Sequence, residues 1–329
     1  MRVCIFGAGA VGGHLAAKLA ATGHAVSVVS RGANLAAMRA RGLTLRHGKD
    51  VIHGKVNASD DPAALGPQDA VFVTTKATGL PAFAAAAAPL LGPETPVVFV
   101  QNGVPWWYAQ GLGKDRPAPP DLSKLDPGGA LAHAIDARRV IGAVVYSSND
   151  VVEPGVIENH SVGRNMLVLG ETDDRATARL TRLREAVEAA GMASPAASDL
   201  RASVWDKLMI NFGATLTVLV EEPISVVMND PRLAATRARM MEEGRAICAA
   251  HGVDPANAPR RPGGAQASGA TPHKPSMLQD YELERPMEVE AILLAPLAFA
   301  AAAGVPAPTL SAVAALISWR AARKGLFSP

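Results

Sequence analysis

The first half of the chain alternates short apolar runs with alanine-rich stretches of helical periodicity. The apolar runs are continuous, as in strands that are buried on both faces of a sheet. Between them lie longer segments of the kind that form helices packed on such a sheet. This alternation is typical of βαβ units and predicts a parallel sheet, with strands at residues 3–6, 25–29, 71–74 and 97–100 and helices at residues 11–21 and 82–91.

The pattern changes between residues 111 and 136, where Gly, Pro, Asp and Lys dominate without periodicity and predict a loop or insertion. Strand patterns return at residues 140–147 and 165–169, with a predicted turn at Pro154-Gly155 between them. We therefore expect an antiparallel extension of the sheet. A helix is predicted next, at residues 177–190, ending at Gly191.

After Ser198-Asp199 the chain is helical in pattern to its end. Long helices are predicted at residues 200–220, 230–251 and 288–303, with a Gly/Pro-rich connection at 259–275. The expected organisation is an α/β domain over residues 1–199 followed by an all-α domain over residues 200–329.

Composition narrows the class of protein. The chain has 329 residues, enough for two domains, and its 49% hydrophobic and 19% charged residues are typical of a globular protein. Lys and Arg number 32 against 30 Asp and Glu, so the net charge of +2 gives no global footprint for nucleic acid or an anionic membrane. The late apolar run at residues 291–303 contains Pro296 and is too short to span a bilayer.

The two cysteines, Cys4 and Cys248, lie in separate apolar segments, and no cluster has metal-ligand spacing. We expect two buried thiols and no metal site. The strand pattern that begins directly after Met1-Arg2 argues against a signal peptide. A cytoplasmic protein without membrane or nucleic-acid partners is the expectation.

A glycine-rich motif of the form GxGxxG follows the first predicted strand and opens the first predicted helix. Its glycines would allow a tight turn, a close backbone approach to a pyrophosphate, and close packing of helix on strand. The positive end of the helix dipole would then face the phosphates. The alternative is a structural turn without a ligand, but this placement favours a dinucleotide site formed by Gly7, Ala8, Gly9, Ala10, Val11 and Gly12.

The end of the second predicted strand decides between the two nicotinamide dinucleotides. NAD-selective sites usually place Asp or Glu there to bind the ribose 2′-hydroxyl, whereas this chain has Ser30-Arg31. A guanidinium and a hydroxyl would hold a 2′-phosphate through charge-assisted hydrogen bonds. We therefore predict NADPH/NADP⁺ as the cofactor, the alternative being that Arg31 is an ordinary surface arginine.

A second group of polar residues lies on the first long helix of the C-terminal half. Lys207, Asn211 and Thr215 are spaced i, i+4 and i+8, so they share one face of a segment otherwise suited to burial. A lysine with a pKa lowered by burial can donate a proton near neutral pH to a carbonyl oxygen that gains charge during hydride addition. The alternative is a lysine that extends to solvent from an apolar helix.

Two further segments add polar groups. Gln101-Asn102-Gly103 follows a buried strand, at the carboxyl edge where open α/β sheets bind ligands. Ser276 and Glu288 add a hydroxyl and a carboxylate ahead of another helix.

Taken in order, these segments make the whole chain resemble the ketopantoate reductase family, the 2-dehydropantoate 2-reductases. The resemblance rests on GxGxxG at residues 7–12, a Val-Thr-Thr-Lys segment ending in Lys76, Gln-Asn-Gly at 101–103, the helix with Lys207 and Asn211, and Ser276 with Glu288. It implies a Rossmann-type N-terminal domain and a helical C-terminal domain similar to that of 6-phosphogluconate dehydrogenase. The implied reaction is NADPH-dependent reduction of a small-molecule 2-oxo acid, ketopantoate, to the 2-hydroxy acid pantoate for pantothenate biosynthesis, in a cleft between the domains.

The resemblance also assigns roles to residues. Lys207 would be the general acid, with Glu288 supporting the lysine, the substrate and the cofactor. Asn211, Ser276 and Thr215 would hold the hydroxyl or carboxylate of the substrate. Lys76 and Asn102 would lie near the cofactor, with Asn102 also touching the substrate.

Some positions depart from the family pattern. Thr215 stands where a second asparagine is expected, and the segment 284–290 keeps its glutamate with altered neighbours. Trp106-Trp107-Tyr108 and the insertion at 111–136 resemble a longer paralogous branch. Two alternatives therefore stay open: a reductase of another 2-oxo acid or of an imine, and a non-catalytic NADP(H) sensor. The apolar helical half is also compatible with a homodimer.

Overall fold

The computed structural model describes residues 1–263 and 273–328, which form two compact units. The first unit comprises Met1–Gln101 and Gly128–Leu200, and the second comprises Asn102–Pro127 and Arg201–Pro329. Residues 102–127 thus belong to the helical unit and interrupt the domain expected over residues 1–199. Their Gly/Pro-rich sequence has no periodicity, so the pattern gave no sign of what they pack against.

A seven-stranded sheet, within the described residues, forms the centre of the first unit, with strand order β11-β8-β7-β6-β1-β2-β5. All neighbouring pairs are parallel except β11 with β8, which is the predicted antiparallel extension. This confirms the predicted α/β class. The strands are β1 (Arg2–Phe6), β2 (Ala25–Val29), β5 (Asn57–Ser59), β6 (Ala70–Val73), β7 (Val97–Val100), β8 (Val140–Tyr146) and β11 (Met166–Glu171).

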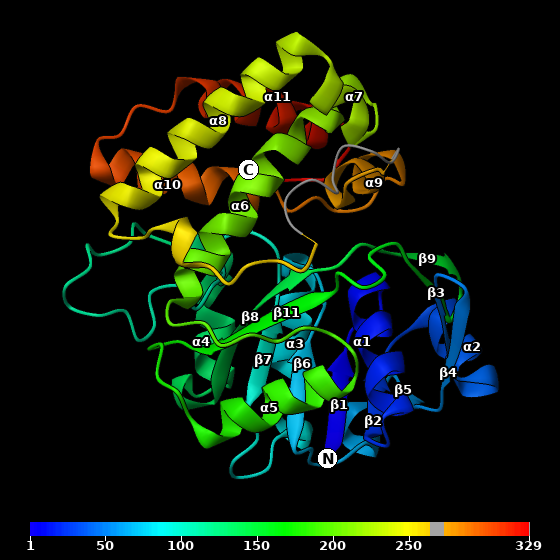
Figure 1. The fold of residues 1–329 in the computed structure, drawn as a ribbon. Coiled ribbons are helices and arrows are strands. Elements are labelled where there is room, and N and C mark those ends of the chain that lie inside the picture. Colours follow the sequence, from blue (N-terminus) through cyan, green and yellow to red (C-terminus); the bar gives the residue numbers. More distant parts are fainter. Residues whose placement is uncertain (264–272, 329) are drawn as a thin grey trace. The chain divides into compact units, whose positions relative to one another are not determined.

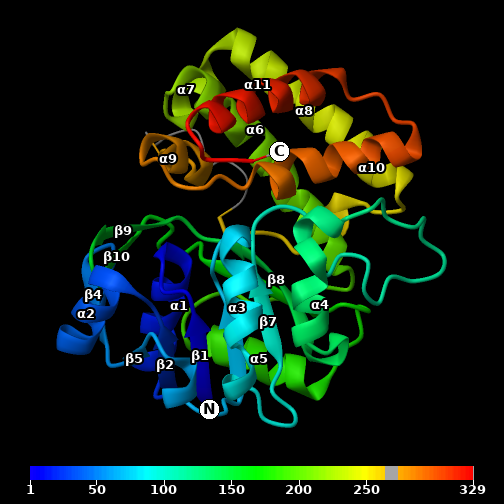
Figure 2. The same cartoon turned by 180° about the vertical axis from the view of Figure 1, so that it is seen from behind.

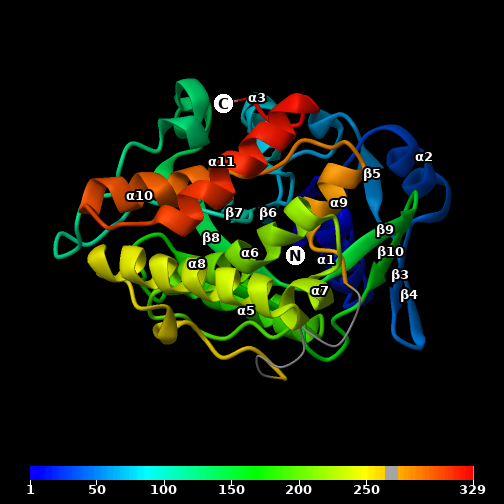
Figure 3. The ribbon, with the colours of Figure 1, turned by 90° about the horizontal axis from the view of Figure 1, so that it is seen from above.

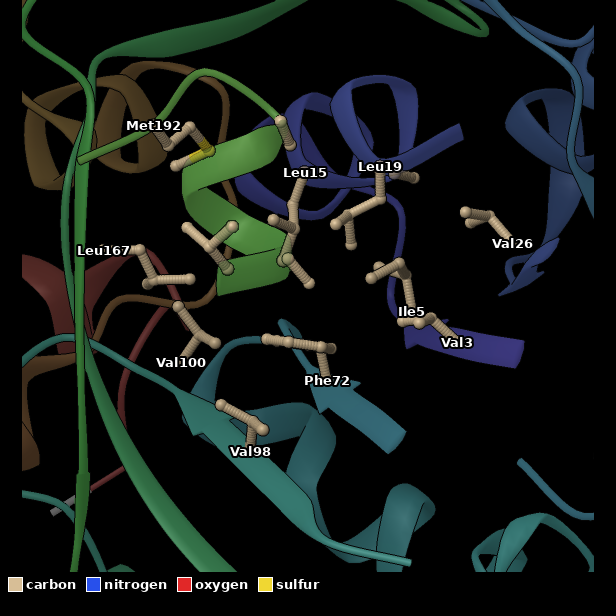
Figure 4. Close-up of a cluster of buried hydrophobic side chains, with 14 of the residues drawn as sticks. Val3, Ile5, Leu15, Leu19, Val26, Phe72, Val98, Val100, Leu167 and Met192 are labelled. Carbon is tan, nitrogen blue, oxygen red and sulfur yellow. The ribbon is translucent and has the colours of Figure 1, made fainter. Parts of the chain in front are cut away.

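Helices cover both faces of this sheet, with α1 and α5 on one face and α3 on the other (Figures 1 and 2). On the first face, Leu15 and Leu19 of α1 point toward Ile5 and Phe72 of the strands, in one buried apolar cluster (Figure 4). The predicted helix at 82–91 is shorter than expected, because Pro89 lies in a separate 3₁₀ turn. The helices of the unit are α1 (Ala10–Ala21), α2 (Gly32–Arg41), α3 (Leu80–Ala86), α4 (Ala130–Ala134) and α5 (Ala178–Ala189).

A second, four-stranded sheet lies beside α1 and was not predicted. Its order is β4-β3-β10-β9, formed by β3 (Leu43–His47), β4 (Asp50–Gly54), β9 (Asn149–Glu153) and β10 (Val156–Asn159). The predicted turn at Pro154-Gly155 therefore joins β9 to β10 in this sheet and not in the main one. A Cβ on Gly13 of α1 would lie 2.8 Å from the Ile157 side chain, so the glycine permits the close packing of helix on sheet.

The second unit is helical, as predicted, and Figure 3 shows its helices from above. A five-residue π-helical turn at Glu290–Leu294 precedes α10, within the single helix expected over 288–303. The absence of a Cβ on Gly244 of α8 leaves room for Met209 and Phe212 of α6. The helices are α6 (Leu200–Val220), α7 (Ile224–Asn229), α8 (Pro231–Ala250), α9 (Ser276–Glu282), α10 (Ala295–Ala303) and α11 (Pro308–Arg323).

Buried aromatic residues explain why residues 102–127 join the helical unit. Trp205 Nε1 donates a hydrogen bond of 2.8 Å to the Tyr108 hydroxyl, and the Tyr108 and Phe299 rings meet edge to face. The fully buried Arg201 donates to the carbonyls of Tyr108 and Gln110. In the described part of the chain, the helices are all too short or too polar to cross a membrane.

Candidate active site

The glycine-rich loop between β1 and α1 leaves a helix N-terminus open to a ligand. Gly7 has φ +103°, a conformation that side-chain-bearing residues rarely adopt. Gly9 caps α1 without a side-chain hydrogen bond, and no heavy atom lies within 4 Å of the place where its Cβ would be. Backbone N–H groups at such an open N-terminus suit a phosphate, so the loop fits the diphosphate of a dinucleotide.

Thr74, at the end of β6, holds this loop in shape. Its Oγ1 donates a hydrogen bond of 2.7 Å to the carbonyl oxygen of Gly7. A Cβ on Gly12 would lie 2.2 Å from that same carbonyl, so the third glycine of the motif is sterically required. Gln101 Nε2 in turn donates to the carbonyls of Val73 and Thr75, at 2.8 and 3.2 Å.

Lys76 is the residue predicted from the Val-Thr-Thr-Lys segment, whereas Thr74 was not predicted. Lys76 directly precedes a 3₁₀ turn at Ala77–Gly79, after β6. Thr74 could have been predicted from the sequence. It directly follows the parallel strand β6, so its hydroxyl lies at the same sheet edge as the glycine-rich loop after the neighbouring strand β1.

Ser30 and Arg31 follow β2 at that edge. The backbone N–H of Gly7 donates to the Val29 carbonyl at 3.0 Å, which ties the end of β2 to the start of the glycine-rich loop. Arg31 is exposed, forms the N-cap of α2, and its guanidinium makes no hydrogen bond to another described residue. A 2′-phosphate at this position would meet a solvated guanidinium and the Ser30 hydroxyl, so these residues fit NADP(H).

The predicted polar face of α6 is present in the second unit. Lys207 and Asn211 are partly buried and Thr215 is fully buried. The Asn211 Nδ2 atom is buried and has no hydrogen-bond partner among the described residues. The Thr215 hydroxyl instead donates to the Phe212 carbonyl at 2.7 Å, so its hydrogen is used within α6.

The electrostatic surroundings of Lys207 favour proton transfer near neutral pH. The pKa of Lys207 is lowered from 10.5 to about 8; burial is the largest cause, the positive charge of Arg261 adds to the lowering, and Asp206 opposes it. An ammonium group with this pKa is largely charged at pH 7 and still gives up its proton readily. Lys207 therefore combines a positive charge with the acidity that protonation of an alkoxide requires.

The remaining predicted residues come from three other segments of the second unit. Ser276 is the exposed first residue of α9, and Glu288 is partly buried just before the π-helical turn. Asn102 is the first residue of the segment 102–127. Two residues later, the backbone N–H of Val104 donates a hydrogen bond of 2.8 Å to the Ala291 carbonyl. The segment with Asn102 and the helix that follows Glu288 are thus directly joined, at a π turn of the kind that is frequent in functional sites.

Replacing Gly103 with alanine is expected to lower the free energy of unfolding by about 3 kcal/mol. Gly103 has φ +82°, and an added Cβ would lie 2.5 Å from the carbonyl carbon and oxygen of Ala291. Gly304→Ala is the matched control, because Gly304 has φ +65° and open space around it. Urea denaturation should show a loss of only about 1 kcal/mol for the control; equal losses in both variants would contradict the role of the close contact.

Two family models match the chain and together cover most of it. The model described as ketopantoate reductase PanE/ApbA matches residues 3–174, and the model of the C-terminal part of the same family matches residues 199–321. The chain belongs to the ketopantoate reductase family. The N-terminal match contains the glycine-rich loop with Thr74 and Arg31, and the C-terminal match contains Lys207 and Glu288.

Individual family members agree with this over their full lengths. A 2-dehydropantoate 2-reductase from Mesorhizobium japonicum is 40% identical over 331 residues, covering 100% of both chains. A solved structure from Ralstonia solanacearum MolK2, of a protein assigned as a ketopantoate reductase, is 36% identical with a TM-score of 0.85 and covers 99% of both chains. The 2-dehydropantoate 2-reductase structure from Geobacter metallireducens is 26% identical with a TM-score of 0.79, covering 97% of this chain and 99% of the other.

Proposed function

We propose that this protein catalyses the reduction of 2-dehydropantoate to pantoate with NADPH. The observation that carries the proposal is Lys207, a partly buried lysine whose pKa lies near 8, on the same helix face as the unused amide donor of Asn211. Membership of the ketopantoate reductase family and the 2-dehydropantoate 2-reductase from Mesorhizobium japonicum support the substrate.

The residues of the first unit would bind the cofactor. The loop at Gly7–Gly12 offers its backbone N–H groups to the diphosphate, and Ser30 with Arg31 meets the 2′-phosphate. Lys76, and Asn102 and Glu288 from the second unit, would complete the cofactor contacts. Bound NADPH supplies the hydride; the protein supplies orientation and charge.

The residues of the second unit would bind the 2-oxo acid and move the proton. The Lys207 Nζ would donate a hydrogen bond to the ketone oxygen, polarise the carbonyl group and transfer a proton to that oxygen as it becomes a hydroxyl. Asn211 and Ser276 would hold the carboxylate or hydroxyl of the substrate with neutral groups, which leave the charge of the lysine intact. Thr215 would contact the substrate through its hydroxyl oxygen, and Glu288 would support the lysine.

The proposal also assigns the cofactor to the domain of residues 1–199 and the substrate to residues 200–329, with residues 102–127 added to the latter. We place the enzyme in the cytoplasm. The free Cys4 and Cys248 thiols fit a reducing compartment. Both are buried, and burial raises their pKa to about 12 and about 11.

A substrate panel read by NADPH oxidation tests the function. We expect 2-dehydropantoate to give the highest kcat/KM among 2-oxo acids of different chain length and branching, and cyclic imines to react slowly. If another 2-oxo acid gave a higher kcat/KM, that acid would be the substrate in place of 2-dehydropantoate. This alternative is favoured by Thr215, which offers no amide and directs its hydrogen to Phe212. No turnover with any carbonyl compound or imine, together with tight NADPH binding, would favour the sensor.

A further inference from the structure

We propose that two opposite charges, Asp206 and Arg261, act through Lys207 to adjust the pH range over which the enzyme works. The inference rests on the proposed function, in which Lys207 is the proton donor. Neither residue needs to touch the substrate, so both are positioning residues. Asn211 and Thr215 on the polar face of α6 would contact the substrate, whereas Asp206 and Arg261 would change only how readily Lys207 loses its proton.

The two charges reach Lys207 from different parts of the second unit. Asp206 precedes the lysine on α6, whereas Arg261 lies in the Gly/Pro-rich connection that follows α8. Arg261 Nε and Asp206 Oδ2 are 3.9 Å apart, at the outer limit of an ion pair. Their side chains are only 29% and 25% exposed, so solvent screens their fields incompletely.

The charges act on Lys207 in opposite directions. Burial is the largest cause of the low pKa of Lys207; Arg261 lowers the pKa further, and Asp206 raises it. From other elements, Arg237 of α8 packs against Gly213, further along α6, and Glu288 lies ahead of the π-helical turn. The arginine thus favours loss of the proton and the aspartate favours its retention, so their balance adjusts the pH at which the buried lysine stops being an acid.

Variants that each remove one of the two charges should shift the pH profile in opposite directions. With saturating NADPH, kcat/KM for 2-dehydropantoate should fall at alkaline pH as Lys207 loses its proton. Arg261→Gln should move this fall to higher pH and Asp206→Asn to lower pH, each by about half a pH unit. Arg261→Lys keeps the charge and should restore the wild-type profile. A purely structural role would lower the rate at every pH and leave the midpoint in place.

A titration without substrate separates this inference from the proposed function. In protein labelled with ¹³C-lysine, the Lys207 Cε resonance can be assigned by its loss in Lys207→Met and followed against pH in each variant. Opposite displacements of its midpoint in Arg261→Gln and Asp206→Asn would support the charge pair even if the protein reduced no 2-oxo acid. Unchanged midpoints, or displacements in the same direction, in variants that keep the wild-type thermal unfolding midpoint would overturn it.

Discussion

Lys207→Met is expected to lower kcat for 2-dehydropantoate reduction by about 10³-fold. Methionine has a similar length and fills a similar volume, but it offers neither a charge to polarise the ketone nor a proton for the new hydroxyl. Because Lys207 is assigned to the substrate and not to the cofactor, the dissociation constant of NADPH should change by less than about twofold. Stopped-flow hydride transfer and fluorescence titration with NADPH measure the two effects separately.

Lys274→Met is the matched control for the lysine. Lys274 belongs to the same unit and loses the same charge, but it is an exposed residue whose ammonium pairs with Glu282 at 2.8 Å. Its replacement should leave kcat within about twofold of wild type, since exposed ion pairs contribute little. If Lys207→Met kept more than a tenth of the wild-type kcat, the proton would have to come from another group.

The parts of the fold that follow from local pattern could be predicted from the sequence. Strands β1, β2, β6 and β7 are continuous apolar runs because both faces of the sheet are covered, and the Gly7–Gly12 motif depends only on neighbours in the chain. The polar face of α6 follows from helical spacing alone. The structure places Lys207, Asn211 and Thr215 on one helix, although the Thr215 hydroxyl bonds to its own backbone.

The parts that depend on distant contacts could not be predicted. The small sheet pairs β3 with β10, more than a hundred residues later, and both are too short to stand out. Residues 102–127 join the helical unit through Tyr108 and the buried Arg201, neither of which carries a periodic signal. The π-helical turn at Glu290–Leu294, hydrogen-bonded to Val104, arises in the same way. Arg261 follows α8 and is distant from α6 in the chain, yet its Nε lies 3.9 Å from Asp206 Oδ2.

The cofactor preference should depend on a single exposed side chain. Arg31→Glu is expected to lower kcat/KM for NADPH by about 10²-fold and to change kcat/KM for NADH by only a few-fold. The substitution replaces an attraction for the 2′-phosphate with a repulsion, whereas NADH has a neutral hydroxyl there. Steady-state rates with each cofactor, at a fixed saturating concentration of 2-dehydropantoate, measure the ratio.

Arg39→Glu separates a local contact from the general field of the protein. Arg39 lies on the same helix, α2, and its reversal changes the net charge by the same amount, but its guanidinium already pairs with Asp60 at 3.0 Å. If Arg31 touches the 2′-phosphate, the control should keep the wild-type preference at about 0.15 M salt, because a charge beyond a Debye length of about 8 Å is screened. Equal losses of NADPH preference in both variants would instead mean that α2 attracts the phosphate only through its summed charge, and Ser30-Arg31 would then not be a binding site.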